Sequence, residues 1–266
     1  MHGAPDDPTD ISDAGRIERF DHAGAALVAE TRHGPAGGPT FVLVHGIGMG
    51  RKVFGDLTEL LAADGTVVAI DQPGYGEAPE PPRTPTMERT ADVVAAFLAH
   101  RGIRDAVLIG HSMGTQVVTE IAVRHPHLAG RVVLVAPTVD RTARSASRQL
   151  ARLGRDLLAE SPKVLLLGGR EYLRAGPHLR RKLRAMLRHR PEDVYPRIAA
   201  PTLVLRGADD RVCPAEWCRF VAASIPDARF VAVPGHRHET MIRDARPAAE
   251  AIRSFLDELS PGRRRR

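Results

Sequence analysis

The sequence predicts an α/β fold: a mostly parallel central sheet with helices on both faces and an inserted helical cap. Three observations carry this prediction. Short apolar runs alternate with longer helical patterns, the apolar runs are continuous, and the stretch 138–196 breaks the rhythm. Strands that alternate with helices wind into parallel βαβ units. Continuous apolar strands are typical of a sheet that is buried on both faces.

The expected elements follow the apolar runs along the chain. An opening pair of strands is expected at 17–20 and 25–30, and the remaining strands at 40–46, 66–71, 106–110, 131–137, 202–207 and 229–234. Helices are expected at 51–63, 87–101, 112–124, 214–224 and 246–259. Residues 15–137 and 197–260 therefore form the predicted core, and the chain shows no internal repeat.

The insertion 138–196 carries apolar residues at helical spacing, with arginines on the opposite faces. The apolar positions are Leu150, Leu153, Leu157, Leu179, Leu183, Met186 and Leu187. Two or three amphipathic helices are expected, lying over the carboxyl edge of the sheet as a cap or lid. That edge is where open α/β sheets bind ligands.

Charge is unevenly distributed along the chain. The net charge is +6, yet residues 141–190 hold 12 Arg and 2 Lys against 3 acidic residues. This basic cap either attracts anionic partners or substrates, or simply presents solvated helix faces. Nucleic-acid binding is not expected, because aromatic residues make up only 4% of the chain and no module signature is present.

The ends and the cysteines suggest a cytoplasmic protein. Residues 1–14 are acidic and lack the features of a signal peptide, and they and the basic tail 261–266 are expected to be disordered. No apolar run approaches the ~20 residues that span a bilayer, so stable membrane insertion is not expected. Cys213 and Cys218 are expected to be reduced thiols, and their spacing makes no recognisable metal site.

The segment Gly110-His111-Ser112-Met113-Gly114 stands between a predicted strand and a predicted helix. It is either an ordinary tight turn or a strained corner that exposes the serine hydroxyl. Small residues on both sides relieve the clashes that such a corner creates. The strand before and the helix behind favour the corner, with Ser112 as a nucleophile.

A second glycine-containing loop, His45-Gly46-Ile47-Gly48, follows the predicted strand 40–46. It is either a simple turn or a loop that donates a backbone N–H to the reacting group. The amides of Ile47 and Met113 would then form an oxyanion hole, in which one donor typically contributes ~10²–10³ in rate.

Carboxylates and imidazoles follow two later strands. Asp209 and Asp210 come after the strand 202–207, and His236 and His238 come after the strand 229–234. Because the carboxyl ends of parallel strands share one edge, these loops should meet the serine corner. The order Ser, Asp, His is that of one kind of catalytic triad, but position alone does not choose within either pair.

From about residue 17 to 259 the chain resembles the α/β-hydrolase fold superfamily, in the branch with a helical cap. Its G-x-x-D-x-x-x-P pattern matches 207–214 and selects Asp210, and its P-G-x-x-H pattern matches 234–238 and selects His238. The loop 71–76 resembles the D-x-P-G-x-G turn of the superfamily, which implies a structural Asp71. Supporting roles are implied for His45, Gly46, Gly110, His111 and Gly114.

The resemblance implies a serine hydrolase that cleaves a carboxylic ester, or a related acyl compound, with Ser112, Asp210 and His238. Neither a metal nor an organic cofactor is expected, and the expected partner is a small ester or acyl substrate, of which an anionic one is a candidate. The alternatives are a C–C bond hydrolase or a cofactor-free peracid-forming enzyme with the same triad, a non-catalytic small-molecule receptor, and a membrane-docking lipase. The sequence leaves the oligomeric state open.

Overall fold

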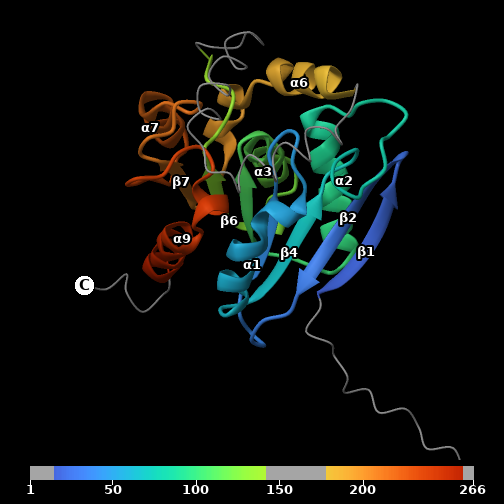
Figure 1. Ribbon diagram of the computed structural model, residues 1–266, viewed down its shortest axis with the longest axis horizontal. Helices are drawn as coiled ribbons and strands as arrows, with labels where there is room; N and C mark the ends of the chain where they lie inside the picture. Colours follow the sequence, from blue (N-terminus) through green and yellow to red (C-terminus); the bar gives the residue numbers. More distant parts are fainter. Residues whose placement is uncertain (1–14, 142–177, 260–266) are drawn as a thin grey trace, which may run out of the picture.

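The computed structural model describes residues 15–141 and 178–259 (Figure 1). Residues 1–14, 142–177 and 260–266 lie outside the described residues. They comprise both expected disordered ends, the last residue of the expected core, and the cap positions Leu150, Leu153 and Leu157. The expected cap therefore stays a prediction. In the described part of the chain, no helix is long and apolar enough to cross a membrane.

The fold is an eight-stranded sheet with the order β1-β2-β4-β3-β5-β6-β7-β8. Only the pairs β1–β2 and β2–β4 are antiparallel, and all other neighbours are parallel. The fold class predicted from the sequence is thus confirmed. The strands are β1 (Arg16–His22), β2 (Ala25–Arg32), β3 (Thr40–Val44), β4 (Thr66–Asp71), β5 (Ala106–His111), β6 (Ala129–Val135), β7 (Thr202–Gly207) and β8 (Ala228–Val233).

Helices cover both faces of the sheet. The α-helices are α1 (Gly55–Ala62), α2 (Met87–His100), α3 (Met113–Arg124), α6 (Leu179–Arg188), α7 (Ala215–Ser224), α8 (Thr240–Arg243) and α9 (Arg246–Leu259). Short 3-10 turns lie at Arg51–Phe54, Pro126–Leu128, Pro191–Asp193 and Tyr195–Arg197. Two buried clusters divide the core: α2, α3 and α7 pack on one face, and α1, α8 and α9 pack on the other.

The apolar strands alternate between these two clusters. Phe41 and Leu43 of β3 belong to the cluster beneath α1 and α9, whereas Val42 and Val44 belong to the cluster beneath α2 and α3. Successive side chains of a strand point to opposite faces, so a strand covered on both sides is apolar throughout. This is why the continuous apolar runs predicted the buried strands.

Most boundaries lie within two residues of the prediction, and two of the differences have a clear structural cause. The expected helix 51–63 opens with the 3-10 turn Arg51–Phe54 before α1 begins, and there the Arg51 N–H donates to an Asp71 carboxyl oxygen at 2.5 Å. The expected strand 131–137 is shifted to Ala129–Val135. It ends there because Ala136 turns to a φ of 49°, although the Ala136 N–H still donates to the Leu205 carbonyl at 2.7 Å.

Candidate active site

Ser112 occupies the corner between β5 and α3. Its φ of 52° and ψ of −118° place it in the positive-φ region, where a residue with a Cβ is strained. Its N–H donates to the Val135 carbonyl at 2.9 Å, and its carbonyl accepts from the N–H and the hydroxyl of Thr115, at 3.0 Å and 2.6 Å. These bonds hold the strained conformation in place, so the segment is a sharp corner and not an ordinary turn.

Two glycines allow the chain to pass through this corner. A Cβ on Gly110 would lie 2.5 Å from the Gly114 carbonyl oxygen, and a Cβ on Gly114 would lie 2.1 Å from the Val44 carbonyl oxygen. Real Cβ atoms do not approach other atoms so closely. The start of α3 therefore packs directly on the ends of β5 and β3, and both positions require glycine.

The Ser112 side chain is less open than the sequence predicted. Only 7% of the residue is exposed, because loops from other strands close around the corner. A Cβ on Gly46 would lie 3.0 Å from the Ser112 Cβ, and the His238 imidazole lies against the Ser112 hydroxyl. The Ser112 hydroxyl is thus enclosed by the loop that carries Gly46 and by the His238 imidazole, both of which the sequence predicted to lie at this corner.

His238 joins the serine to a carboxylate. Its Nε2 lies 3.1 Å from Ser112 Oγ, and its Nδ1 lies 2.9 Å from Asp210 Oδ2. The imidazole and the carboxylate are both buried, with side-chain exposures of 4% and 0%. Three segments, with Asp210 28 residues and Ser112 126 residues before His238, thus form one continuous hydrogen-bonded row.

The Asp210 carboxylate is held on both oxygens. Oδ1 accepts from the backbone N–H groups of Val212 and Cys213, at 2.7 Å and 2.8 Å, while Oδ2 faces His238. Behind the loop, the buried Arg206 guanidinium donates to the carbonyls of Asp210 and Cys213, at 2.7 Å and 3.0 Å. The loop cannot easily rotate the carboxylate away, so its orientation toward the imidazole is fixed.

The two neighbouring aspartates differ in position, and so do the two neighbouring histidines. Asp209 is exposed, and its N–H donates to the His236 carbonyl at 2.9 Å. His236 is half-buried. Asp210 and His238, the two that the resemblance selected, are the pair that lies beside Ser112.

His45 fixes the loop after β3. Its Nδ1–H donates to the Gly46 carbonyl at 2.7 Å, and its Nε2 accepts from the Gln72 N–H at 3.1 Å. Burial lowers the pKa of the His45 imidazole, so the ring is held neutral in this tautomer. Gly46, the residue before Ile47, lies against Ser112, and Met113 begins α3 directly after Ser112. The oxyanion hole expected from the amides of Ile47 and Met113 stays a prediction.

His111 bonds to the backbone of His238. Its Nε2–H donates to the His238 carbonyl at 3.1 Å, and the two rings lie 5.2 Å apart. Burial, followed by the nearby His238 ring, lowers the pKa of His111 to about 3. His111 therefore stays neutral and positions the loop that carries His238.

Lys182 and Tyr75 form a buried contact that the sequence did not predict. Lys182 is buried, with its Nζ 4.3 Å from the centroid of the Tyr75 ring, and it pairs with Glu80 at 2.7 Å. The Tyr75 hydroxyl donates to Met113 Sδ at 3.6 Å. A lysine on an arginine-rich helix resembles a solvated residue, so the sequence offered no signal for this link between α6 and the corner.

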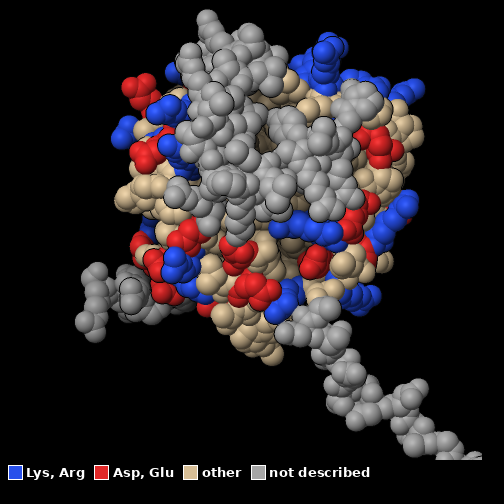
Figure 2. All heavy atoms as spheres, in the orientation of Figure 1, with Lys and Arg blue, Asp and Glu red and all other residues tan. Residues whose placement is uncertain are grey.

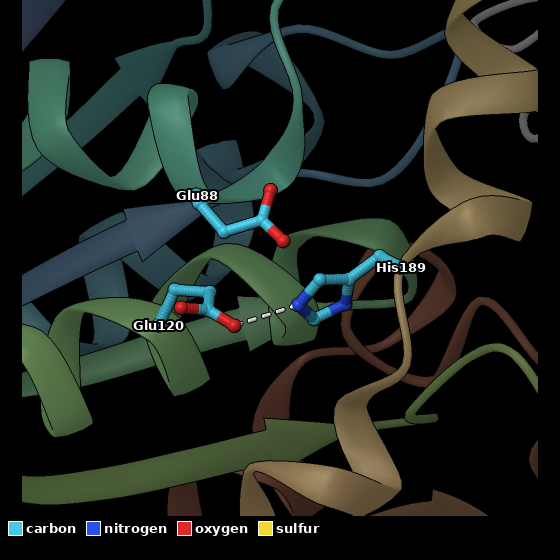
Figure 3. A group of neighbouring side chains, drawn as sticks. All are labelled: Glu88, Glu120 and His189. Atoms are coloured by element: carbon cyan, nitrogen blue, oxygen red, sulfur yellow. Dashed lines mark hydrogen bonds and ion pairs between the residues drawn. The ribbon is translucent and has the colours of Figure 1, made fainter.

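A separate group of metal-ligating side chains lies under α6. One ligand atom from each of Glu88, Glu120 and His189 lies within 4.8 Å of the others, and His189 Nε2 is 2.7 Å from Glu120 Oε1 (Figure 3). These residues come from α2, from α3 and from just after α6. Their wide separation in the sequence hid the group, which by its donor types could hold a divalent cation.

Comparisons with known proteins agree with this architecture. The model of the Alpha/beta hydrolase family matches residues 41–252. A provisionally named non-heme haloperoxidase of Mycobacterium phage D29 is 29% identical over 262 residues, covering 85% of this chain and 90% of the relative. A pimeloyl-[acyl-carrier protein] methyl ester esterase of Chromobacterium violaceum is 28% identical over 251 residues, covering 83% and 95%.

Solved structures share the fold over nearly the whole chain. A hydrolase from Pseudomonas aeruginosa PA01 is 25% identical and superimposes with a TM-score of 0.77, covering 91% of this chain and 99% of the other. The family match extends over most of the core, including the corner at Ser112 and the loops that carry Asp210 and His238. The chain belongs to the alpha/beta hydrolase family.

Proposed function

We propose that the protein is a serine hydrolase that cleaves a carboxylic ester or a related acyl compound. The observation that carries this proposal is the His238 imidazole, which lies between Ser112 Oγ at 3.1 Å and Asp210 Oδ2 at 2.9 Å. A serine hydroxyl is a weak nucleophile until a base within hydrogen-bond reach takes its proton. His238 Nε2 is within that reach.

In the proposed first step, Ser112 Oγ attacks the carbonyl carbon of the ester. His238 Nε2 accepts the hydroxyl proton, and the carboxylate of Asp210 stabilises the imidazolium that forms. The protonated His238 then gives this proton to the leaving alcohol, and an acyl-serine remains. The two backbone donors to Asp210 Oδ1 keep the other oxygen directed at the imidazole throughout.

The developing negative charge on the carbonyl oxygen needs nearby donors. The proposed donors are the backbone N–H groups of Ile47 and Met113. Met113 is the first residue of α3, where the N–H groups of a helix have no partner within the helix and the dipole favours negative charge. Such preorganised donors are often the largest single contribution to catalysis.

In the second step, water attacks the acyl-serine while His238 again accepts a proton. The collapse of this intermediate releases the carboxylic acid and restores Ser112. The steps use no metal or organic cofactor, and they apply equally to an ester, a thioester or another activated acyl group.

The choice of an ester over other acyl chemistry draws on one relative in particular. The Chromobacterium violaceum protein is named for methyl ester hydrolysis, whereas the phage relative is named for haloperoxidase chemistry. At these identities neither name fixes the substrate, because one fold and one triad support several reactions. Ser112 and His238 provide every proton transfer that ester cleavage needs, and the name of the Chromobacterium violaceum relative favours an ester as the acyl compound.

The proposal is tested by the turnover of 4-nitrophenyl esters of graded chain length. Wild-type protein should hydrolyse at least one ester with saturation kinetics, and Ser112→Ala should lower kcat on the order of 10⁶-fold. Thr115→Ser, a change one turn along α3 that keeps a hydroxyl beside the Ser112 carbonyl, is the control for folding of the corner. Wild-type turnover by Ser112→Ala would rule the proposal out.

A further inference from the structure

A pocket of about 430 Å³ lies between α6 and the segment that leads into α2. Four arginines line it: Arg83 from the segment before α2, and Arg181, Arg184 and Arg188 from α6. The three on α6 are spaced by three and four residues, so they follow one face of the helix. Figure 1 shows α6 beside one end of α2.

The charge of this pocket is not balanced by its surroundings. Among the described residues, none of the four guanidinium groups forms an ion pair with a carboxylate, and Glu88 is the one acidic side chain in the described lining. In the sequence, residues 142–177 carry seven Lys or Arg against three Asp or Glu, so that segment brings no surplus of carboxylates. An excess of like charge around a concave site attracts the opposite charge.

Three contacts with the rest of the fold hold α6 in place. Lys182 is buried and pairs with Glu80 at 2.7 Å, the Met186 carbonyl accepts from Gln116 at 3.2 Å, and His189 bonds to Glu120 at 2.7 Å (Figure 3). These three anchors span the helix from its first turn to the residue after its end. The helix backbone that carries three of the arginines is therefore fixed, and it places these side chains along one edge of the pocket.

The same pocket is a poor place for a cation, although Glu88 and His189 line it. The His189 imidazole already bonds to Glu120, and four guanidinium groups repel a positive ion. A monocarboxylate needs only one bidentate arginine. A phosphate group, with up to two negative charges and several acceptor oxygens, makes use of more than one guanidinium.

We propose that this pocket binds the phosphate group of a soluble phosphorylated compound through Arg184 and Arg188, assisted by Arg83 and Arg181. Glu88 and His189 also line the pocket, and they are suited to hydrogen bonds with hydroxyl or amide groups next to the phosphate. This site is separate from the proposed ester hydrolysis and does not depend on it.

Calorimetric titration of the full chain with glycerol 3-phosphate at constant ionic strength tests the site. Arg184→Gln/Arg188→Gln should weaken binding at least tenfold. Arg180→Gln removes an exposed arginine of the same helix that does not line the pocket, and it should change the Kd less than twofold. No measurable binding by the wild type, or equal losses in both variants, would overturn the proposal.

Two further measurements are needed. One distinguishes a lipid phosphate from a soluble phosphate, and the other distinguishes the phosphate site from the proposed ester site. Sedimentation with phosphatidylglycerol vesicles tests a lipid headgroup, and binding of vesicles without binding of glycerol 3-phosphate would overturn the assignment to a soluble compound. The double variant should hydrolyse a neutral ester with a kcat/KM within twofold of wild type. A selective loss of phosphate binding would then support the site whether or not the ester proposal holds.

Discussion

The imidazole of His111 donates its Nε2–H to the carbonyl oxygen of His238, 3.1 Å away, so the residue next to the proposed nucleophile holds the loop of the proposed base. This bond links β5 directly to the segment after β8. Burial makes a charged His111 ring costly, so the ring is neutral and carries its single proton on Nε2.

His111 should make the protein sensitive to acid. Its pKa is about 3 in the folded chain and about 6.5 in an unfolded one. Between these pH values the unfolded chain binds more protons, so the free energy of unfolding falls as the pH is lowered, by up to ~1.4 kcal/mol per pH unit. His111→Gln keeps a donor for the His238 carbonyl but does not titrate. Urea unfolding at pH 7 and pH 4.5 should show a smaller loss for this variant than for wild type.

The exposed His127 provides the control for this comparison. His127→Gln should lose as much stability between the two pH values as wild type does. If His111→Gln behaved like His127→Gln, the acid sensitivity would come from other groups.

The two neighbouring aspartates should differ sharply in their effect on turnover. Asp210→Asn removes the charge that faces His238 Nδ1 and should lower kcat on the order of 10⁴-fold. Asp209 is exposed, so Asp209→Asn should stay within a few-fold of wild type. Steady-state ester kinetics measure both. Equal losses would show that the carboxylate beside the imidazole has no special role.

Two helical glycines should respond in opposite directions to alanine. In Gly114→Ala the new Cβ would lie 2.1 Å from the Val44 carbonyl oxygen, so the start of α3 must move and the protein should lose several kcal/mol of stability or fail to fold. A Cβ on Gly55, at the start of α1, meets nothing within 4 Å. Gly55→Ala should stabilise by up to ~1 kcal/mol through helix propensity. Thermal unfolding of the two variants checks the sign.

The buried ion pair beneath the loop 71–76 should matter more than its exposed neighbour. Arg51 and Asp71 form an ion pair in which each side chain is 1% exposed, so Arg51→Leu leaves a buried carboxylate without its partner and should cost about 3–5 kcal/mol. Lys52 is 62% exposed in its pair with Glu77, and Lys52→Leu should cost at most ~1 kcal/mol. Similar losses in urea unfolding would contradict this difference.

Much of this fold could be predicted from the sequence because its strands are buried on both faces. Runs such as Phe41–Val44 are apolar at every position, and the glycines at 110 and 114 mark a corner that no other residue fits. The motif around Ser112 and the patterns that contain Asp210 and His238 likewise depend on local spacing, which the sequence displays directly.

What the sequence could not show depends on contacts between distant segments. Lys182 looks like one more charge of a basic helix, yet it is buried over Tyr75. Arg51 looks like a surface residue at a helix start, yet it neutralises Asp71 twenty residues away. The pairing of Glu120 with His189 has no local signature either, since helical periodicity says which face is polar and not what that face meets.

The central claim is that the base on one loop activates the alcohol on another, and the rate of covalent labelling by a fluorophosphonate probe tests it most directly. Peptide mapping should find the phosphonyl adduct on Ser112 in wild-type protein, and His238→Ala should slow its formation at least a hundredfold, while His236→Ala labels at the wild-type rate. An unmodified Ser112, or equally fast labelling without the His238 imidazole, would contradict the claim.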